Sequence, residues 1–292
     1  MSAISLPWFL HESSAPYFDL PIGWDRGVLI VTSILRLQFA IVLLDLILCI
    51  GLRNRFLFTN TTVDPQRKTR PSRSWYTFSL LTNDYPGRWF LLHAFWNFGI
   101  TLACIPDVLE TIYRPSVACM PAKSYNLLPT LMSMALHLYH CVAPWFWHKF
   151  TREDFFHHIV FAIGGLGSIS VLWPWGPGAN FAFLFLTGLP GGLDYLMLGM
   201  VKLKLMNRLS EKSINSAVNA WIRGPGCTIA AAWTYSAWRE GSGSLLMGPP
   251  SVIVVLNFVL IFTNGNYYSQ RVVSNEARCR TLETAKKSSK EE

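Results

Sequence analysis

The 292-residue chain is 51% hydrophobic and 14% charged, whereas charged residues make up roughly 25% of an ordinary soluble domain. Its apolar residues gather in windows of about twenty, which is long enough to cross a hydrocarbon core of about 30 Å. The formal net charge is +8, but the basic residues flank these windows, where they hold orientation and meet anionic headgroups. The composition excludes an ordinary soluble domain, argues against nucleic acid as a partner, and predicts a polytopic membrane protein.

In chain order, the apolar windows predict an all-α bundle of about seven transmembrane spans. The spans are Gly27–Gly51, Trp89–Glu110, Leu127–Trp147, Phe155–Pro174, Ala179–Val201, Ile214–Trp238 and Leu245–Tyr268. The motif "WPWGPG" between the fourth and fifth spans favours a tight turn, so we expect these two spans to form an antiparallel hairpin. Residues 1–270 are predicted to form a single bundle, and residues 271–292 a basic cytosolic tail with a composition compatible with disorder.

The distribution of Lys and Arg predicts the orientation of the bundle. Residues 52–88 carry seven of these basic residues and residues 271–292 carry six, while Lys202, Lys204 and Arg208 follow the fifth span. The intervening loops are poor in basic residues. Because basic loops stay on the cytosolic side, we expect an exoplasmic or lumenal N-terminus and a cytosolic C-terminus.

Polar side chains inside the predicted spans fall at one depth, within about 5–16 Å of the cytosolic face by helical rise. They are Asp45, His93, Asn97, His140, His157, His158, Asp194, Asn219 and Arg223. Such groups are costly in hydrocarbon and usually face the bundle interior or a wet cavity. We therefore expect a polar chamber that opens toward the cytosol. The expected substrate-binding residues within it are Asp45, His93, His140 and Arg223.

Two glycine-flanked prolines lie next to charged members of this set. Pro190 precedes Asp194 in "GLPGGLD", and Pro225 follows Arg223 in "WIRGPGC". A proline inside a span lacks the amide hydrogen and frees an upstream carbonyl, which is tolerated where that carbonyl faces protein or water. Both motifs therefore predict broken helices beside the chamber.

The stretch "KFTREDFFHHIVFAIGGLGSI" places a charged segment directly before His157 and His158. It resembles the central stretch of the TLC (TRAM, Lag, CLN) homology domain, and the later "GLPGGLDYLMLGMVK" is similar to a downstream segment of that family. The likeness covers roughly residues 88–268. The resemblance implies an endoplasmic-reticulum lipid protein, and the ceramide synthases of the family join an acyl group from acyl-CoA to a sphingoid amine.

On this resemblance, His157 and His158 are the catalytic pair and Asp194 is a supporting acid. The chain departs from the synthases in its later span, where it has Gly191-Gly192-Leu193-Asp194 in place of their His-Asp and Ser-Asp cluster. The resemblance therefore leaves three roles open. The chain is an acyltransferase, a non-enzymatic protein that binds lipids or regulates membrane composition, or a structural subunit of a membrane complex.

The residue chemistry itself allows acyl transfer. A neutral imidazole acts as a base or a nucleophile near neutral pH. Lys202, Lys204 and Arg208 at the cytosolic rim are expected to bind the phosphates of acyl-CoA, which enters as a substrate and not as a cofactor. Membrane lipids are the other expected partners, and homo-oligomerisation stays open.

Metal-dependent and receptor functions fit the sequence less well. A membrane di-iron site needs more histidine clusters than the chain offers, and its six scattered cysteines form no metal motif. A zinc ion held by His140, His148 and either His157 or His158 is the remaining metal alternative. The seventh span has no lysine for a retinal Schiff base. We therefore predict no metal and no cofactor.

Overall fold

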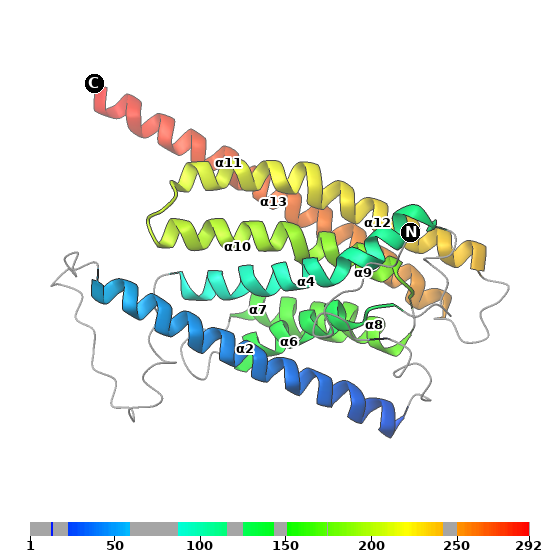
Figure 1. Ribbon diagram of the computed structural model, residues 1–292. Coiled ribbons are helices and arrows are strands. Elements are labelled where there is room, and N and C mark those ends of the chain that lie inside the picture. The colour runs from blue at the N-terminus through cyan, green and yellow to red at the C-terminus, as the bar shows by residue number, and fades with distance from the viewer. Residues whose placement is uncertain are drawn as a thin grey trace.

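The structure, a computed structural model, describes residue 13 and residues 23–58, 87–115, 125–142, 151–173, 175–241 and 250–291. The α-helices are α2 (Trp24–Phe58), α4 (Arg88–Tyr113), α6 (Leu128–Val142), α7 (Arg152–Phe155), α8 (Ser168–Leu172), α9 (Gly178–Phe183), α10 (Leu189–Lys202), α11 (Arg208–Val218), α12 (Gly224–Gly241) and α13 (Ser251–Glu291). Three π-helical segments, η3 (Phe156–Gly167), η4 (Leu184–Gly188) and η5 (Asn219–Arg223), join neighbouring α-helices without a break. We name the resulting continuous elements the α7–α8, α9–α10 and α11–α12 rods (Figure 1).

Four of the described helices are long and apolar enough to cross a membrane. They are Trp24–Leu52, Arg88–Tyr113, Gly178–Lys202 and Ser251–Lys286, and a shorter apolar helix covers Phe156–Leu172. Each of the seven windows predicted from the sequence contains helix. The prediction of an all-α fold is therefore confirmed for the described residues.

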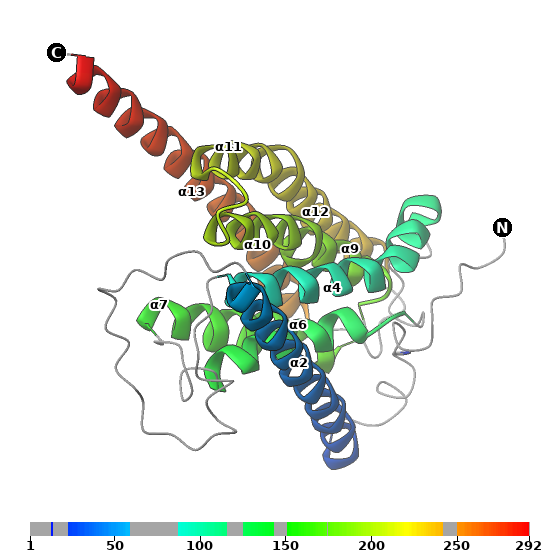
Figure 2. The same ribbon diagram turned by 60° about the vertical axis from the view of Figure 1, so that its left-hand side comes forward.

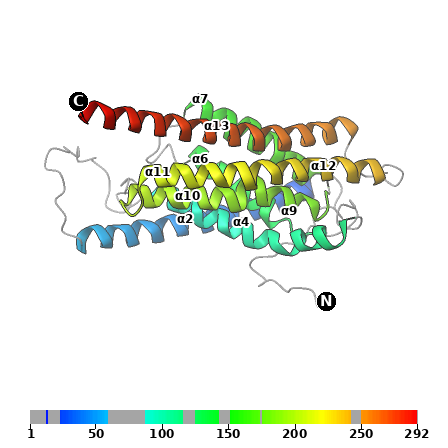
Figure 3. The ribbon, with the colours of Figure 1, turned by 90° about the horizontal axis from the view of Figure 1, so that it is seen from above.

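We also call the single helices α2, α4, α6 and α13 rods. Six of the seven described rods, all except α2, form a closed ring. Their order around the ring is α4, α6, the α7–α8 rod, α13, the α11–α12 rod and the α9–α10 rod. Each packs on the next, and the α9–α10 rod packs on α4 and closes the ring. α2 lies outside the ring, against α4 and α6 (Figure 2). Seen from above, α4, the α9–α10 rod, the α11–α12 rod and α13 run nearly parallel (Figure 3).

The chain turns at the "WPWGPG" motif, but the two rods that it joins are not a closely packed hairpin. The α7–α8 rod packs mainly on α6, whereas the α9–α10 rod packs mainly on α4 and α12. The turn itself contains Gly176 at a φ of 71°, a left-handed conformation that glycine adopts without steric cost. The two rods thus occupy different parts of the ring and leave space between them.

The π-helical segments lie where the sequence is rich in glycine and proline. η4 and η5 each end two residues before a proline, Pro190 and Pro225 respectively. Because a proline cannot donate to the carbonyl four residues upstream, a widened π-turn accommodates the missing hydrogen bond. The helix breaks predicted from these prolines correspond to π-helical distortions, and the rods continue through them. η3 is 12 residues long and contains His157 and His158.

α4 and the α9–α10 rod approach closely because glycines line their contact. A Cβ added to Gly188 would lie 3.0 Å from Thr101 Oγ1, and one added to Gly192 would lie 2.8 Å from Phe98 Cε1. The two glycines have the four-residue spacing typical of close helix contacts. This close packing brings Tyr195 next to the polar side chains of α4.

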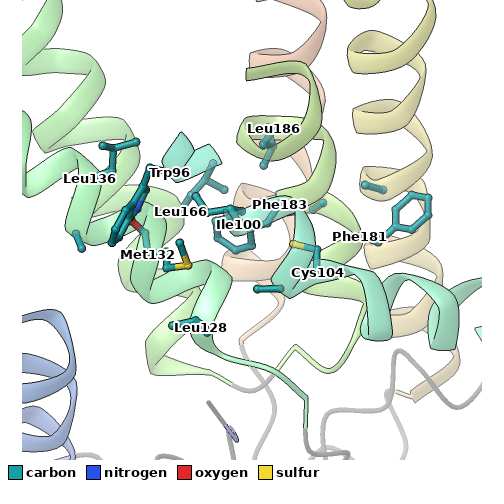
Figure 4. Close-up of a cluster of buried hydrophobic side chains, with 14 of the residues drawn as sticks. Trp96, Ile100, Cys104, Leu128, Met132, Leu136, Leu166, Phe181, Phe183 and Leu186 are labelled. Atoms are coloured by element: carbon teal, nitrogen blue, oxygen red, sulfur yellow. The ribbon is translucent and has the colours of Figure 1, made fainter. Parts of the chain in front are cut away.

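Hydrophobic side chains fill the ring on one side of these polar groups. Figure 4 shows Trp96 and Ile100 of α4 among Met132 of α6 and Phe183 of α9. Trp96 also donates a hydrogen bond from Nε1 to the carbonyl of Met132 at 2.8 Å. Close van der Waals contact over many atoms and this hydrogen bond fix α4 against its neighbours.

α13 continues well beyond the apolar window that predicted it. It is one helix from Ser251 to Glu291. Residues 271–291 are therefore helical, and the disorder with which their composition is compatible is not observed. The segment is rich in Ala, Glu, Arg and Lys, which are strong helix formers, and Glu276 pairs with Arg280 one turn later. Arg280 also donates from Nη2 to Ser213 Oγ of α11 at 2.9 Å, which ties the extension to the ring.

We predict that Gly192→Leu destabilises the protein by about 1–3 kcal/mol, because the new side chain overpacks the contact with Phe98. Gly27→Leu on α2 is the matched control, since nothing lies within 4 Å of a Cβ at that position. The measurement is thermal unfolding in detergent, followed through the labelling of the buried thiols Cys104 and Cys227. Equal melting temperatures for the two variants would contradict the close α4–α10 contact.

Candidate functional site

A cavity of about 110 Å³ lies inside the ring. Each of the six rods contributes to its wall: His93 from α4, His140 from α6, His158 from the α7–α8 rod, Asp194 from the α9–α10 rod, Arg223 from the α11–α12 rod and Tyr268 from α13. Among the described rods, α2 alone contributes no residue. Because one water needs only about 10–15 Å³ of such space, the cavity has room for several waters or for part of an organic ligand.

Three histidines on the wall form a continuous row, which we call the histidine relay. His93 Nδ1 lies 2.6 Å from the backbone carbonyl of Trp89, and its Nε2 contacts Nε2 of His140. Nδ1 of His140 lies 3.0 Å from the ring nitrogens of His158. The ring centroids are 4.4 Å apart for His93 and His140 and 4.2 Å apart for His140 and His158.

The carbonyl of Trp89 sets the direction of hydrogen bonding along the relay. A carbonyl only accepts, so Nδ1 of His93 donates to it, and Nε2 of a neutral His93 is then an acceptor. His140 therefore donates from Nε2 to His93 and accepts at Nδ1 from His158. A neutral His158 that donates one N–H to His140 keeps the lone pair on its other nitrogen. The relay thus holds His158, a residue with the chemistry of a base or a nucleophile, in the cavity wall.

Two further histidines adjoin the end of the relay. His137 Nδ1 lies 2.7 Å from the carbonyl of Ser133, so by the same reasoning its Nε2 carries the lone pair. The ring of His137 lies 5.2 Å from that of His158 and 5.5 Å from that of His157. His137 and His158 are buried, whereas His157 is exposed, and one ligand atom from each lies within 4.8 Å of the others. These three side chains have the chemistry to hold a metal ion.

Asp194 lies on the wall formed by the α9–α10 rod. Its Oδ1 accepts a hydrogen bond from Asn215 Nδ2 at 2.7 Å, and its Oδ2 accepts one from the Tyr268 hydroxyl at 3.2 Å. The guanidinium carbon of Arg223 lies 4.3 Å from the centroid of the Tyr268 ring. These contacts bring together a carboxylate, a guanidinium group and a phenol on the side of the cavity where α10, η5 and α13 meet.

Buried polar atoms without a hydrogen-bond partner among the described residues also occur on the cavity wall. They are Nε of Arg223, Oδ1 of Asn97 and Oγ1 of Thr187. Leaving a buried donor or acceptor unsatisfied costs about 1–3 kcal/mol, so such groups favour a polar ligand or ordered water. Arg223 supplies a donor, and Asn97 and Thr187 supply acceptors.

Asp45, predicted to bind substrate, is not among the cavity residues. It is fully buried and accepts from Arg88 Nε at 2.7 Å and from Arg88 Nη2 at 2.5 Å. The Tyr139 hydroxyl donates to Asp45 Oδ2 at 2.6 Å. Arg88 was counted above as a loop charge, but it is buried at the start of α4. Asp45, Arg88 and Tyr139 therefore fasten α2 to α4 and α6.

Lys202 is the last residue of α10, Lys204 lies on the connection that follows, and Arg208 is the first residue of α11; all three are exposed. Lys202 is eight residues after Asp194 on the same helix, a distance of about 12 Å by helical rise. Lys204 has a positive φ of 59°, which is rare for a residue with a side chain. The three cations form a basic surface at one end of the ring.

Sequence reasoning overlooked several residues of the site. His137, Tyr195 and Tyr268 were not assigned a role from the sequence. Tyr195 lies 4.5 Å from His93 between ring centroids and directly follows Asp194, so adjacency in the chain was the available signal. Tyr268 ended the seventh predicted span, where aromatic residues are expected for interfacial reasons alone. His148 lies outside the described residues.

Comparisons with models of known protein families, with curated protein sequences and with solved structures found no significant match for this chain.

We predict that Asp45→Leu destabilises the protein by about 3–5 kcal/mol, because it leaves Arg88 buried without its carboxylate partner. The double variant Asp45→Leu plus Arg88→Met removes both charges and is expected to recover most of the loss. Thermal unfolding in detergent measures both variants. If Asp45→Leu alone is as stable as the wild type, the buried ion pair is contradicted. If the double variant is stable but inactive, Asp45 has a role in binding substrate in addition to its structural role.

Proposed function

We propose that the chain is a multi-pass membrane protein of the TLC-like type that transfers an acyl group from acyl-CoA to a lipid amine. The observation that carries this proposal is the relay, which holds three hydrogen-bonded histidines in the wall of a cavity shared by six rods. Four long apolar helices support insertion in a membrane. In this proposal all seven helical windows span the bilayer, with a cytosolic C-terminus, and the membrane is the endoplasmic reticulum.

In the proposed reaction, the lipid amine attacks the thioester carbonyl carbon inside the cavity. An amine proton passes to the lone pair of His158, and the charge that forms is shared along the relay toward His140. Arg223 supplies hydrogen-bond donors to the carbonyl oxygen as it becomes negative, which is usually the largest contribution to catalysis of acyl transfer. The carbon–sulfur bond then breaks, and the CoA thiolate takes the proton from His158. The products are an amide and CoA.

The remaining residues have supporting roles in this proposal. Asp194 holds Tyr268, whose ring contacts Arg223, so the carboxylate positions the cation and acts only indirectly on the histidines. His157 is exposed beside His158 and lies where substrate enters. Lys202, Lys204 and Arg208 bind the CoA phosphates on the cytosolic side. The proposed partners of the chain are membrane lipids and acyl-CoA.

A non-enzymatic lipid-binding protein is the second candidate. The observation that favours it is the mutual pairing of His93, His140 and His158, because buried imidazoles that satisfy one another also serve as interhelical hydrogen bonds. In that role the cavity binds a lipid group and no bond is broken. The two candidates differ in what a change at His158 does.

We predict that His158→Gln abolishes production of the amide lipid while leaving expression and melting temperature near wild type. Glutamine keeps a polar, hydrogen-bonding side chain but cannot shuttle a proton near neutral pH. The measurement is comparative lipidomics of cells expressing each chain, together with turnover of the purified proteins. If His158 only joins helices, His158→Gln retains the lipid effect, and His158→Leu mainly lowers stability, by about 1 kcal/mol per lost hydrogen bond.

We also predict that Lys202→Glu, Lys204→Glu and Arg208→Glu together weaken acyl-CoA binding and that raising the salt concentration does the same to the wild type. Exposed charges are screened within about 8–10 Å at physiological ionic strength. The matched control reverses three exposed cations on the extension of α13, namely Arg271, Arg278 and Lys286. If acyl-CoA affinity changes neither with salt nor with the substitutions at Lys202, Lys204 and Arg208, the ligand enters sideways from the bilayer.

A further inference from the structure

We propose that His137, His157 and His158 form a transition-metal site at the mouth of the cavity, and that a bound metal ion switches the site off. His137 comes from α6, whereas His157 and His158 come from η3. The ligand atoms of all three lie within 4.8 Å of one another. The proposal that a metal binds here does not depend on the proposed acyl transfer. Only the proposed inhibition rests on it.

The hydrogen bonds around these rings match those of metal ligands. A metal-bound histidine commonly donates its other N–H to a backbone carbonyl or a similar acceptor, which fixes the ring and its tautomer. His137 does so toward the Ser133 carbonyl at 2.7 Å, and His158 is held from behind by His140 at 3.0 Å. Both rings are therefore held in place before any metal arrives.

The chemistry of the three donors favours zinc. Imidazole nitrogens suit Zn, Cu, Ni and Fe, and three protein ligands with one open position are typical of an accessible zinc site. At Zn–N distances of about 2.0–2.1 Å, tetrahedral geometry places ligand nitrogens roughly 3.4 Å apart. The present upper limit of 4.8 Å closes to this value with small rotations of the rings. His157 is exposed, so an ion has a route to the site.

This site differs from the zinc alternative considered from the sequence, which used His140 and His148. His140 is engaged with both His93 and His158, so it supports the ligands from behind. His137 replaces it because it lies within 5.5 Å of both η3 histidines between ring centroids. All three histidines line the cavity, so water or the polar group of a lipid in the cavity would complete the coordination.

Metal binding and proton transfer compete for one lone pair. In the proposed reaction, the ring nitrogen of His158 that does not donate its proton to His140 takes the proton of the amine. A coordinated metal occupies that nitrogen, so base catalysis stops until the metal leaves. The site would thereby make acyl transfer sensitive to the free zinc concentration.

The test is titration of purified, tag-free protein in nanodiscs with Co²⁺ followed by Zn²⁺. We expect one Co²⁺ per chain with the visible absorption of tetrahedral nitrogen coordination, and displacement by Zn²⁺. His137→Gln should lower Zn²⁺ affinity roughly tenfold or more, a loss typical of disturbed metal sites. Asp194→Asn, which removes a carboxylate from the opposite wall, is the matched control and should retain wild-type affinity, with melting temperatures verifying that both variants are folded.

Equal, weak binding by the wild type and His137→Gln would overturn the proposal, because it would indicate adventitious binding at surface groups. Loss of binding in Asp194→Asn would overturn the assignment of ligands. Inhibition is tested separately, by measuring amide formation with and without Zn²⁺ in the wild type and in His137→Gln. If no amide forms under any condition, the proposed reaction is contradicted. The metal site is still tested in full by the titration.

Discussion

Polar side chains on apolar helices must find partners inside the bundle, and this constraint organises the whole structure. α4 carries five such buried residues, more than any other described rod. Arg88, its first residue, pairs with Asp45, His93 meets His140, and Asp107 nearer its end accepts hydrogen bonds from Asn126 and Asn180. Because the partners lie on α2, α6, the α9–α10 rod and the segment before α6, satisfying α4 determines which elements surround it.

The same constraint gives the site its chemical direction. A single backbone carbonyl, that of Trp89, fixes the donor nitrogen of His93, and each imidazole then fixes the next. His158 ends the relay in the cavity wall, while Arg223 and Asn97 on other rods present atoms that the described residues do not satisfy. A group of histidines with the chemistry to act on a ligand thus shares one cavity with groups suited to bind it.

Much of this arrangement follows from the sequence, because apolar windows predict helices and polar residues at a shared depth tend to converge. His93, His140, His158, Asp194 and Arg223 were predicted in this way and share one cavity. Asp45 was assigned to the same group because depth alone does not give the direction in which a side chain points. Its partner Arg88 begins a helix and therefore resembled an ordinary loop charge.

Other features depend on departures from regular helix geometry. Projection at the α-helical angle does not apply to η3, where π-turns change the angular positions of His157 and His158. The meeting of these residues with His137 was therefore not accessible from residue spacing. The helical extension of α13 was also missed, since polar composition alone does not separate a solvated helix from a disordered tail.

Solid-state nuclear magnetic resonance of the histidine-labelled protein in lipid vesicles tests the relay most directly. The contacts of His140 with His93 and with His158 predict through-space correlations between ring ¹⁵N nuclei that join three histidines in one network, with His93 protonated at Nδ1. Histidine spectra without such correlations, or with His93 protonated only at Nε2, would contradict the relay and the orientation of His158 that depends on it.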